Sequence, residues 1–210
     1  MNINDLLQGP LRDLMMDQVN QKFQINDTQE ANTAVNGVLA ALMNGLAHNA
    51  STPEGASSLM SAIDRDHDGS ILNDVVGFFN GTTQFQNSST ANGLGILNHI
   101  FGDKTEAAAQ AISKNSGIDT GKILQLMMTF APIVLGFLGK NASSSAQTQS
   151  APSQGGGLLD ILNGATKTVN QQPTNQGLLS KLLDRDGDGN VMDDIADMGF
   201  RTIMGKFLGK

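Results

Sequence analysis

The stretch that decides the fold is KILQLMMTFAPIVLGFLGK, residues 122–140. Between its terminal lysines lies the most apolar run of the chain, Ile123–Leu138. This run is interrupted by Gln125, Thr129, Pro132 and Gly136. Spanning a bilayer takes about 20 consecutive apolar residues, and this run is shorter and broken. We therefore expect a kinked helix buried in a protein core, with a re-entrant or membrane-inserting hairpin left open as the alternative.

Sequences on both sides of this run also favour helices. Apolar residues recur at three- and four-residue spacing in Leu6–Val19 and in Val38–Leu46. Helix-start signals precede other segments: Asn26-Asp27-Thr28 or Asn32-Thr33 before one, Thr52-Pro53 before another and Asp119-Thr120 before a third. No segment sustains the alternation of a β-strand. We expect an all-α protein, a compact multi-helix bundle.

Composition excludes several classes of function. The chain of 210 residues carries a net charge of −7, which disfavours nucleic acid and anionic lipid as partners. It has no cysteine, so thiolate metal sites, cysteine nucleophiles and disulfides are excluded. It has nine Phe but no Tyr or Trp, which leaves few platforms for stacking nucleic-acid bases. The N-terminus shows no classical signal peptide, so we expect a cytoplasmic location, with non-classical export as an alternative.

Two acidic segments share one pattern. DRDHDGSILND spans residues 64–74 and DRDGDGNVMDD spans residues 184–194. Both have D-x-D-x-D-G spacing followed by an apolar residue at the eighth position, and both follow an apolar helical segment. This spacing is typical of the start of an EF-hand calcium loop.

The spacing has a physical reason. Calcium takes six to eight oxygen ligands at about 2.3–2.6 Å, and side chains at positions 1, 3 and 5 of a curled loop point at the ion. Position 6 makes a sharp turn that glycine allows, and position 7 offers its carbonyl oxygen. The candidate ligands of two Ca²⁺ ions are Asp64, Asp66, Asp68, Ser70, Asp74, Asp184, Asp186, Asp188, Asn190 and Asp194.

The closing ligand departs from the EF-hand pattern. Position 12, where an EF-hand has Glu, holds Val75 and Ile195, so Asp at position 11 must substitute. The loops therefore look more like shortened, dockerin-like calcium loops. The alternative is a pair of solvated acidic turns that cap the next helix. That alternative explains Asp74 and Asp194 but leaves the repeated 1-3-5 spacing with Gly at 6 unexplained.

No catalytic constellation is present. The chain lacks a P-loop, a G-x-S-x-G motif and a dinucleotide fingerprint. His48, His67 and His99 are scattered, and we expect them at the surface or at helix ends, with His67 pointing outward from its loop. We expect no enzymatic activity.

The chain divides into three parts. Residues 1–140 form a helical domain with the first calcium-type loop at 64–75, and the Ser/Gln/Gly-rich residues 141–157 form a flexible linker. Residues 158–210 form a C-terminal helical unit with the second loop at 184–195. A loose internal repeat relates 59–75 to 178–195, which favours docking of the C-terminal unit on the bundle.

Two segments also carry a family resemblance. Gly93–Lys104 (GLGILNHIFGDK) and Met127–Lys140 (MMTFAPIVLGFLGK) resemble the bacterial family of unknown function numbered 937, which is YidB-like. Members of that family often end in a D-x-D-x-D-G segment, as this chain does at Asp184. The resemblance implies an all-helical bacterial protein and brings no activity with it.

These observations predict a non-enzymatic calcium-binding protein. Its two loops would stabilise a helical fold or present a helical surface to a protein partner or to a second copy of the chain. The alternative is a membrane-active or oligomer-forming protein that uses the 123–138 helix.

Overall fold

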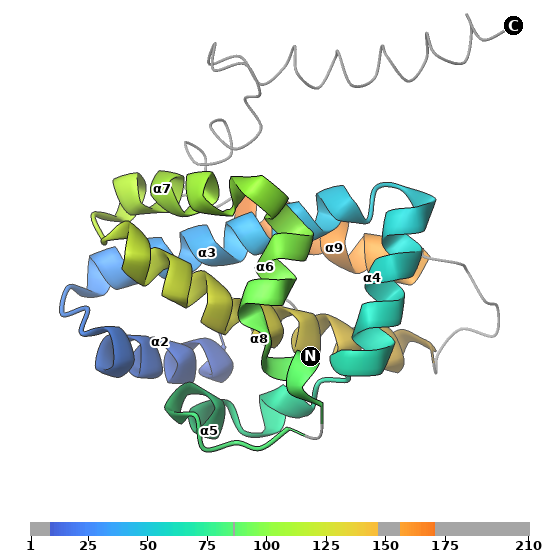
Figure 1. Ribbon diagram of the computed structural model, residues 1–210, viewed down its shortest axis with the longest axis horizontal. Helices are drawn as coiled ribbons and strands as arrows, with labels where there is room; N and C mark the ends of the chain where they lie inside the picture. The colour runs from blue at the N-terminus through green and yellow to red at the C-terminus, as the bar shows by residue number, and fades with distance from the viewer. Residues whose placement is uncertain (1–8, 86, 147–155, 171–210) are drawn as a thin grey trace, which may run out of the picture.

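The computed structural model describes residues 9–85, 87–146 and 156–170, which are helical with no strand among them (Figure 1). The all-α prediction is thus confirmed for this part of the chain. In chain order the elements are α2 (Pro10–Phe23), α3 (Thr28–Asn49), α4 (Pro53–Asp66), η1 (Ser70–Asn73), α5 (Val75–Asn80), η2 (Ser88–Ala91), α6 (Gly93–Phe101), η3 (Gly102–Lys104), α7 (Thr105–Ser116), α8 (Thr120–Ala146) and α9 (Gly156–Asn170).

The predicted start signals begin the helices. The Asp27 carboxylate caps α3 by accepting from the backbone N–H groups of Gln29 and Glu30 at 2.7 and 3.0 Å. Thr52 caps α4, with proline at the first helical position. Asp119 caps α8 through the N–H of Gly121 at 2.8 Å. These bonds satisfy N–H groups that have no partner within the helix.

Helix α8 forms the centre of the core. Its side chains Ile123, Leu126, Met127, Phe130, Ile133, Val134, Phe137 and Leu138 are all buried. It packs against α3, α6 and α7, and also contacts α4 and α9. The predicted buried core helix is therefore present, with Pro132 inside it. By length and composition alone, Thr120–Ala142 could also cross a membrane, with a mean hydropathy of 1.6.

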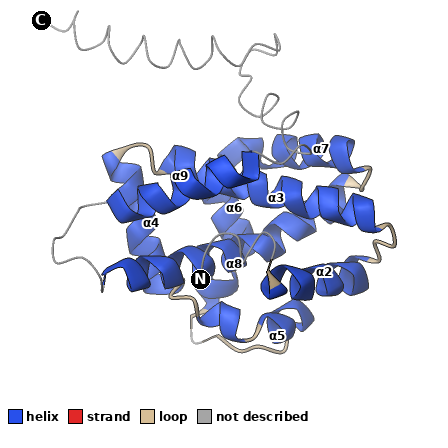
Figure 2. Ribbon diagram, turned by 180° about the vertical axis from the view of Figure 1, so that it is seen from behind, coloured by secondary structure: helices blue, strands red, loops and turns tan. Residues whose placement is uncertain are grey.

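The other helices surround α8. α3 and α7 lie side by side along one edge of the bundle, α2 and α5 lie at the opposite edge, and α6 crosses α8 (Figures 1 and 2). On the other side of α3 lies α9, whose Leu162 and Ala165 are fully buried. α9 is therefore packed on the bundle through Leu162 and Ala165, while residues 171–210 lie outside the described residues.

α4 continues to Asp66, which is buried at the end of its last turn. Two other helices reach into the linker expected at residues 141–157. α8 continues to Ala146, into the expected linker, and the rest of that linker at 147–155 lies outside the described residues. α9 extends from Gly156 to Asn170 and so begins within that expected linker.

Candidate functional site

The first acidic loop joins α4 to α5 across the central helix. Asp64 and Asp66 belong to the last turn of α4, and Asp74 is the residue that precedes α5. Between them Gly69 has a φ of +92°, the left-handed conformation that the sixth loop position was expected to need. The backbone thus makes the sharp turn predicted from the sequence, although the first two acidic positions are helical.

Two glycines of α8 receive this loop. A Cβ atom at Gly139 would lie 1.9 Å from the backbone oxygen of His67, and one at Gly136 would lie 2.5 Å from Cγ2 of Ile71. Neither distance leaves space for a side chain. Ile71, at the eighth loop position, is 1% exposed. The loop is therefore held on the last turns of α8 by close backbone approach and by one buried apolar anchor.

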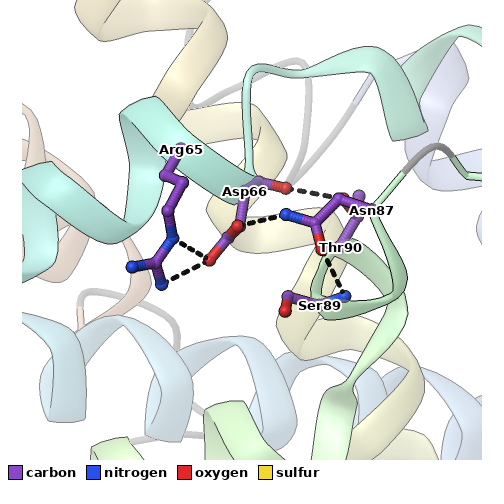
Figure 3. A network of polar contacts seen from close by, with 5 residues as sticks. All are labelled: Arg65, Asp66, Asn87, Ser89 and Thr90. Atoms are coloured by element: carbon purple, nitrogen blue, oxygen red, sulfur yellow. Dashed lines mark hydrogen bonds and ion pairs between the residues drawn. The ribbon is translucent and has the colours of Figure 1, made fainter.

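Asp66 is the centre of a polar network (Figure 3). Its Oδ2 accepts hydrogen bonds from Nε and Nη2 of Arg65 at 3.0 and 2.7 Å. Its Oδ1 accepts a hydrogen bond from Nδ2 of Asn87, and its backbone oxygen accepts one from Oγ1 of Thr90 at 2.8 Å. The Asn87 Oδ1 in turn accepts from the N–H of Ser89 at 3.0 Å.

This network has a structural consequence. Asp66 is only 7% exposed, whereas the Arg65 side chain is 75% exposed. The hydrogen bonds from Arg65 lower the pKa of the Asp66 carboxyl, and the bond from Asn87 acts in the same direction. A buried carboxylate with these partners ties the end of α4 to the η2 turn, which lies far from it in the sequence.

The other carboxylates of the loop are also engaged locally. Asp68 Oδ1 accepts from the N–H of Ser70 at 2.9 Å, which lowers the pKa of Asp68. Asp74 caps α5 through the N–H of Gly77 at 2.9 Å and accepts from Oγ1 of Thr83 at 2.7 Å. Both bonds lower the pKa of the Asp74 carboxyl, and the bond from Thr83 has the larger effect. Asp74 thus performs the helix-capping role weighed in the sequence analysis.

The five candidate ligands of the first loop do not converge on one point. Asp64 is exposed on α4, and within the described residues no group of three or more acidic or histidine side chains is placed to hold a metal ion. For Asp66 to bind calcium here, its carboxylate would have to give up the hydrogen bonds from Arg65 and Asn87. The candidate ligands of the second loop, Asp184, Asp186, Asp188, Asn190 and Asp194, lie outside the described residues.

His67 is not the outward-pointing residue that its loop position predicted. It is 4% exposed, and no described group makes a hydrogen bond with its Nδ1 atom. The reason is that α4 runs on to Asp66, so His67 follows buried Ile63 by four residues and lies on the same face. Helical periodicity extended past Ile63 is the signal that would have found it. Burial lowers the pKa of the His67 imidazole, which favours its neutral form.

This burial predicts a pH dependence of stability. The unfolded imidazole titrates near 6.5 and the folded one at a lower pH, so the unfolded state binds more protons between the two values. The stability that depends on neutral His67 is fully present above the unfolded pKa and is lost as the pH falls toward the folded pKa. We expect a slope of up to about 1.4 kcal/mol per pH unit in urea unfolding measured from pH 7.5 to pH 5.

His67→Gln should flatten this pH dependence, because glutamine does not titrate. His48→Gln is the matched control, since it removes an exposed histidine near the end of α3 and leaves His67 in place. An unaltered slope in His67→Gln would show that another group is responsible.

The described chain is therefore an all-helical bundle that holds an acidic helix–loop–helix segment on its central helix. Residues 5–141 match the model of the family described as "Bacterial protein of unknown function (DUF937)", and the chain belongs to this family. The resemblance drawn from Gly93–Lys104 and Met127–Lys140 is thereby confirmed. No curated protein and no solved structure matches the sequence.

Proposed function

We propose that this protein is a non-enzymatic calcium-binding protein in which the D-x-D-x-D-G loops stabilise a helical fold or present a helical surface to a partner. The observation that carries the proposal is the repeated 1-3-5 carboxylate spacing with glycine at position 6. The left-handed Gly69 and the buried Ile71 support it, since both are features that a calcium loop of this type uses.

The second loop is proposed as the tighter site. It has Gly187 where the first loop has His67, and it adds Asp193 as a further carboxylate. In the first loop, calcium must compete with Arg65 and Asn87 for Asp66. The extra carboxylate favours the ion at the second loop.

Calorimetric titration of the full chain with Ca²⁺ tests this proposal. Asp184→Ala should weaken the tighter site at least tenfold, because it removes the first carboxylate of the second loop. Asp64→Ala should leave that site unchanged. Asp103→Ala is the matched control, since Asp103 is exposed and outside both loops. Thermal melts in Ca²⁺ and in EDTA should differ, with about 2.7 kcal/mol of stabilisation at one hundred times the Kd.

A negative result in both experiments would contradict the proposal. If the wild type releases no heat and its melting temperature does not change at millimolar calcium, both loops are acidic helix caps and the proposal is wrong.

A second candidate function is association with a membrane or with a second copy through α8. The length and hydropathy of α8 support this candidate. Because α8 is buried in the bundle, the other helices would have to separate from it before it could enter a membrane or contact a second copy. Flotation of the protein with liposomes, with and without Ca²⁺, tests the membrane form. No flotation in either condition would eliminate it.

A further inference from the structure

A cavity of about 560 Å³ lies beside the Asp66 network. Its lining comes mainly from the end of α3, from α4 and from α6, and α8 contributes one lining residue, Leu135. Small-molecule sites in proteins have volumes of about 300–1,000 Å³. The cavity is thus of the size that a ligand of moderate size fills.

Part of the cavity lining is apolar and well buried. Leu46, Ile96, Ile100 and Leu135 line it, and each is less than one-tenth exposed. Covering apolar surface is favourable by about 25 cal/mol per Å² removed from water. An apolar group inserted against these side chains would therefore contribute favourably to binding.

The charges at the cavity cancel each other. Among the described lining residues, the only Asp, Glu, Lys or Arg side chains are Arg65 and Asp66, which form an ion pair at 2.7 Å. The second oxygen of the carboxylate is taken by Asn87. A charged ligand would meet a charge that is already neutralised by its neighbour, and burying the ligand's charge without a full counter-charge costs free energy. The lining therefore favours an uncharged ligand.

Two asparagine side chains provide oriented polar groups. Asn49 donates through Nδ2 to the backbone oxygens of His99 at 3.0 Å and Ile100 at 3.3 Å. Asn92 accepts from the N–H of Gly95 at 3.0 Å through Oδ1. These bonds fix both amides, which leaves Oδ1 of Asn49 as an acceptor and Nδ2 of Asn92 as a donor. Fixed groups of this kind orient a ligand at little entropic cost.

We propose that this cavity binds a small uncharged molecule that has an apolar body and a hydroxyl or amide group. The apolar body packs against the leucine and isoleucine side chains, and the polar group bonds to the Asn49 and Asn92 amides. This proposal does not rest on the calcium function: the cavity shares Asp66 with the first acidic loop, but the side chains that would contact the ligand are not among the candidate calcium ligands.

Methyl NMR of the full chain tests the proposal with three probes that share one body: benzyl alcohol, benzoate and benzylamine. Benzyl alcohol should shift the methyl signals of Leu46, Ile96, Ile100 and Leu135 with a Kd in the low millimolar range. Benzoate and benzylamine should bind at least tenfold more weakly, because the two charged side chains among the described lining residues already neutralise each other.

A pair of matched variants locates the binding. Ser58 and Ser57 are adjacent and exposed on α4, but only Ser58 lines the cavity. Ser58→Phe should abolish the benzyl alcohol shifts by filling the site, whereas Ser57→Phe should retain them. Both variants should keep the wild-type melting temperature within a few degrees. The proposal is overturned if benzyl alcohol causes no methyl shifts, if the charged probes bind equally well, or if Ser58→Phe binds as the wild type does.

Discussion

Phe130→Ala should lower the free energy of unfolding by about 4 kcal/mol, since truncation of a buried phenylalanine costs both its transfer free energy and the cavity left behind. The side chain is fully buried at the middle of α8. Its ring meets the ring of Phe79 edge-on, with centroids 6.1 Å apart. Phe130 therefore joins the central helix to α5, the helix that follows the acidic loop.

The effect can be measured by thermal melts followed by circular dichroism, where we expect a decrease of about 10 °C or more. Leu94→Ala is the control, because Leu94 is 57% exposed and its loss should change stability by no more than about 0.5 kcal/mol. Equal melting temperatures for wild type and Phe130→Ala would contradict the packing of α8 in the core. Such a result would strengthen the membrane candidate, in which this helix leaves the bundle.

Local chemistry explains why much of the helical framework could be predicted. Asp27, Thr52 and Asp119 cap helices through bonds to residues two or three positions away, so the sequence alone contains the whole interaction. The burial of Ile123–Leu138 could also be predicted from local sequence, because a segment this apolar is favoured in a core whatever its neighbours are. The turn at Gly69 was predictable because it depends on the local D-x-D-x-D-G pattern and on the conformational freedom of glycine.

The state of the acidic loop was not predictable, because it depends on residues distant in the sequence. Asn87 and Thr90 bind Asp66 across more than twenty residues, and no periodicity links them. Identical D-x-D spacing is therefore compatible with an ion site or with a buried anchor for another turn. Which state forms depends on whether Asp66 binds the ion or its protein partners more strongly, and a calcium titration measures this competition.

Gly93→Ala should destabilise the fold by about 3 kcal/mol, because an added methyl group would be forced into the backbone of α8. A Cβ atom at Gly93 would lie 1.9 Å from the backbone oxygen of Met128. In a regular helix the carbonyl of Met128 would accept a hydrogen bond from the N–H of residue 132. Pro132 has no N–H, so this carbonyl lacks its helical donor. α6 thus begins directly against the part of α8 where the regular helix hydrogen bond is missing.

A matched control has the opposite expected sign. Gly164→Ala in α9 places its methyl group where no atom lies within 4 Å, so helix propensity alone should stabilise the protein by up to about 1 kcal/mol. Urea unfolding of both variants measures the difference. Adding Pro132→Ala to Gly93→Ala separates two causes, since it gives the Met128 oxygen a helical donor but does not remove the clash. If the penalty of Gly93→Ala persists in that background, close backbone approach is the reason for glycine at this position; if it disappears, the proline-dependent geometry of α8 is the reason.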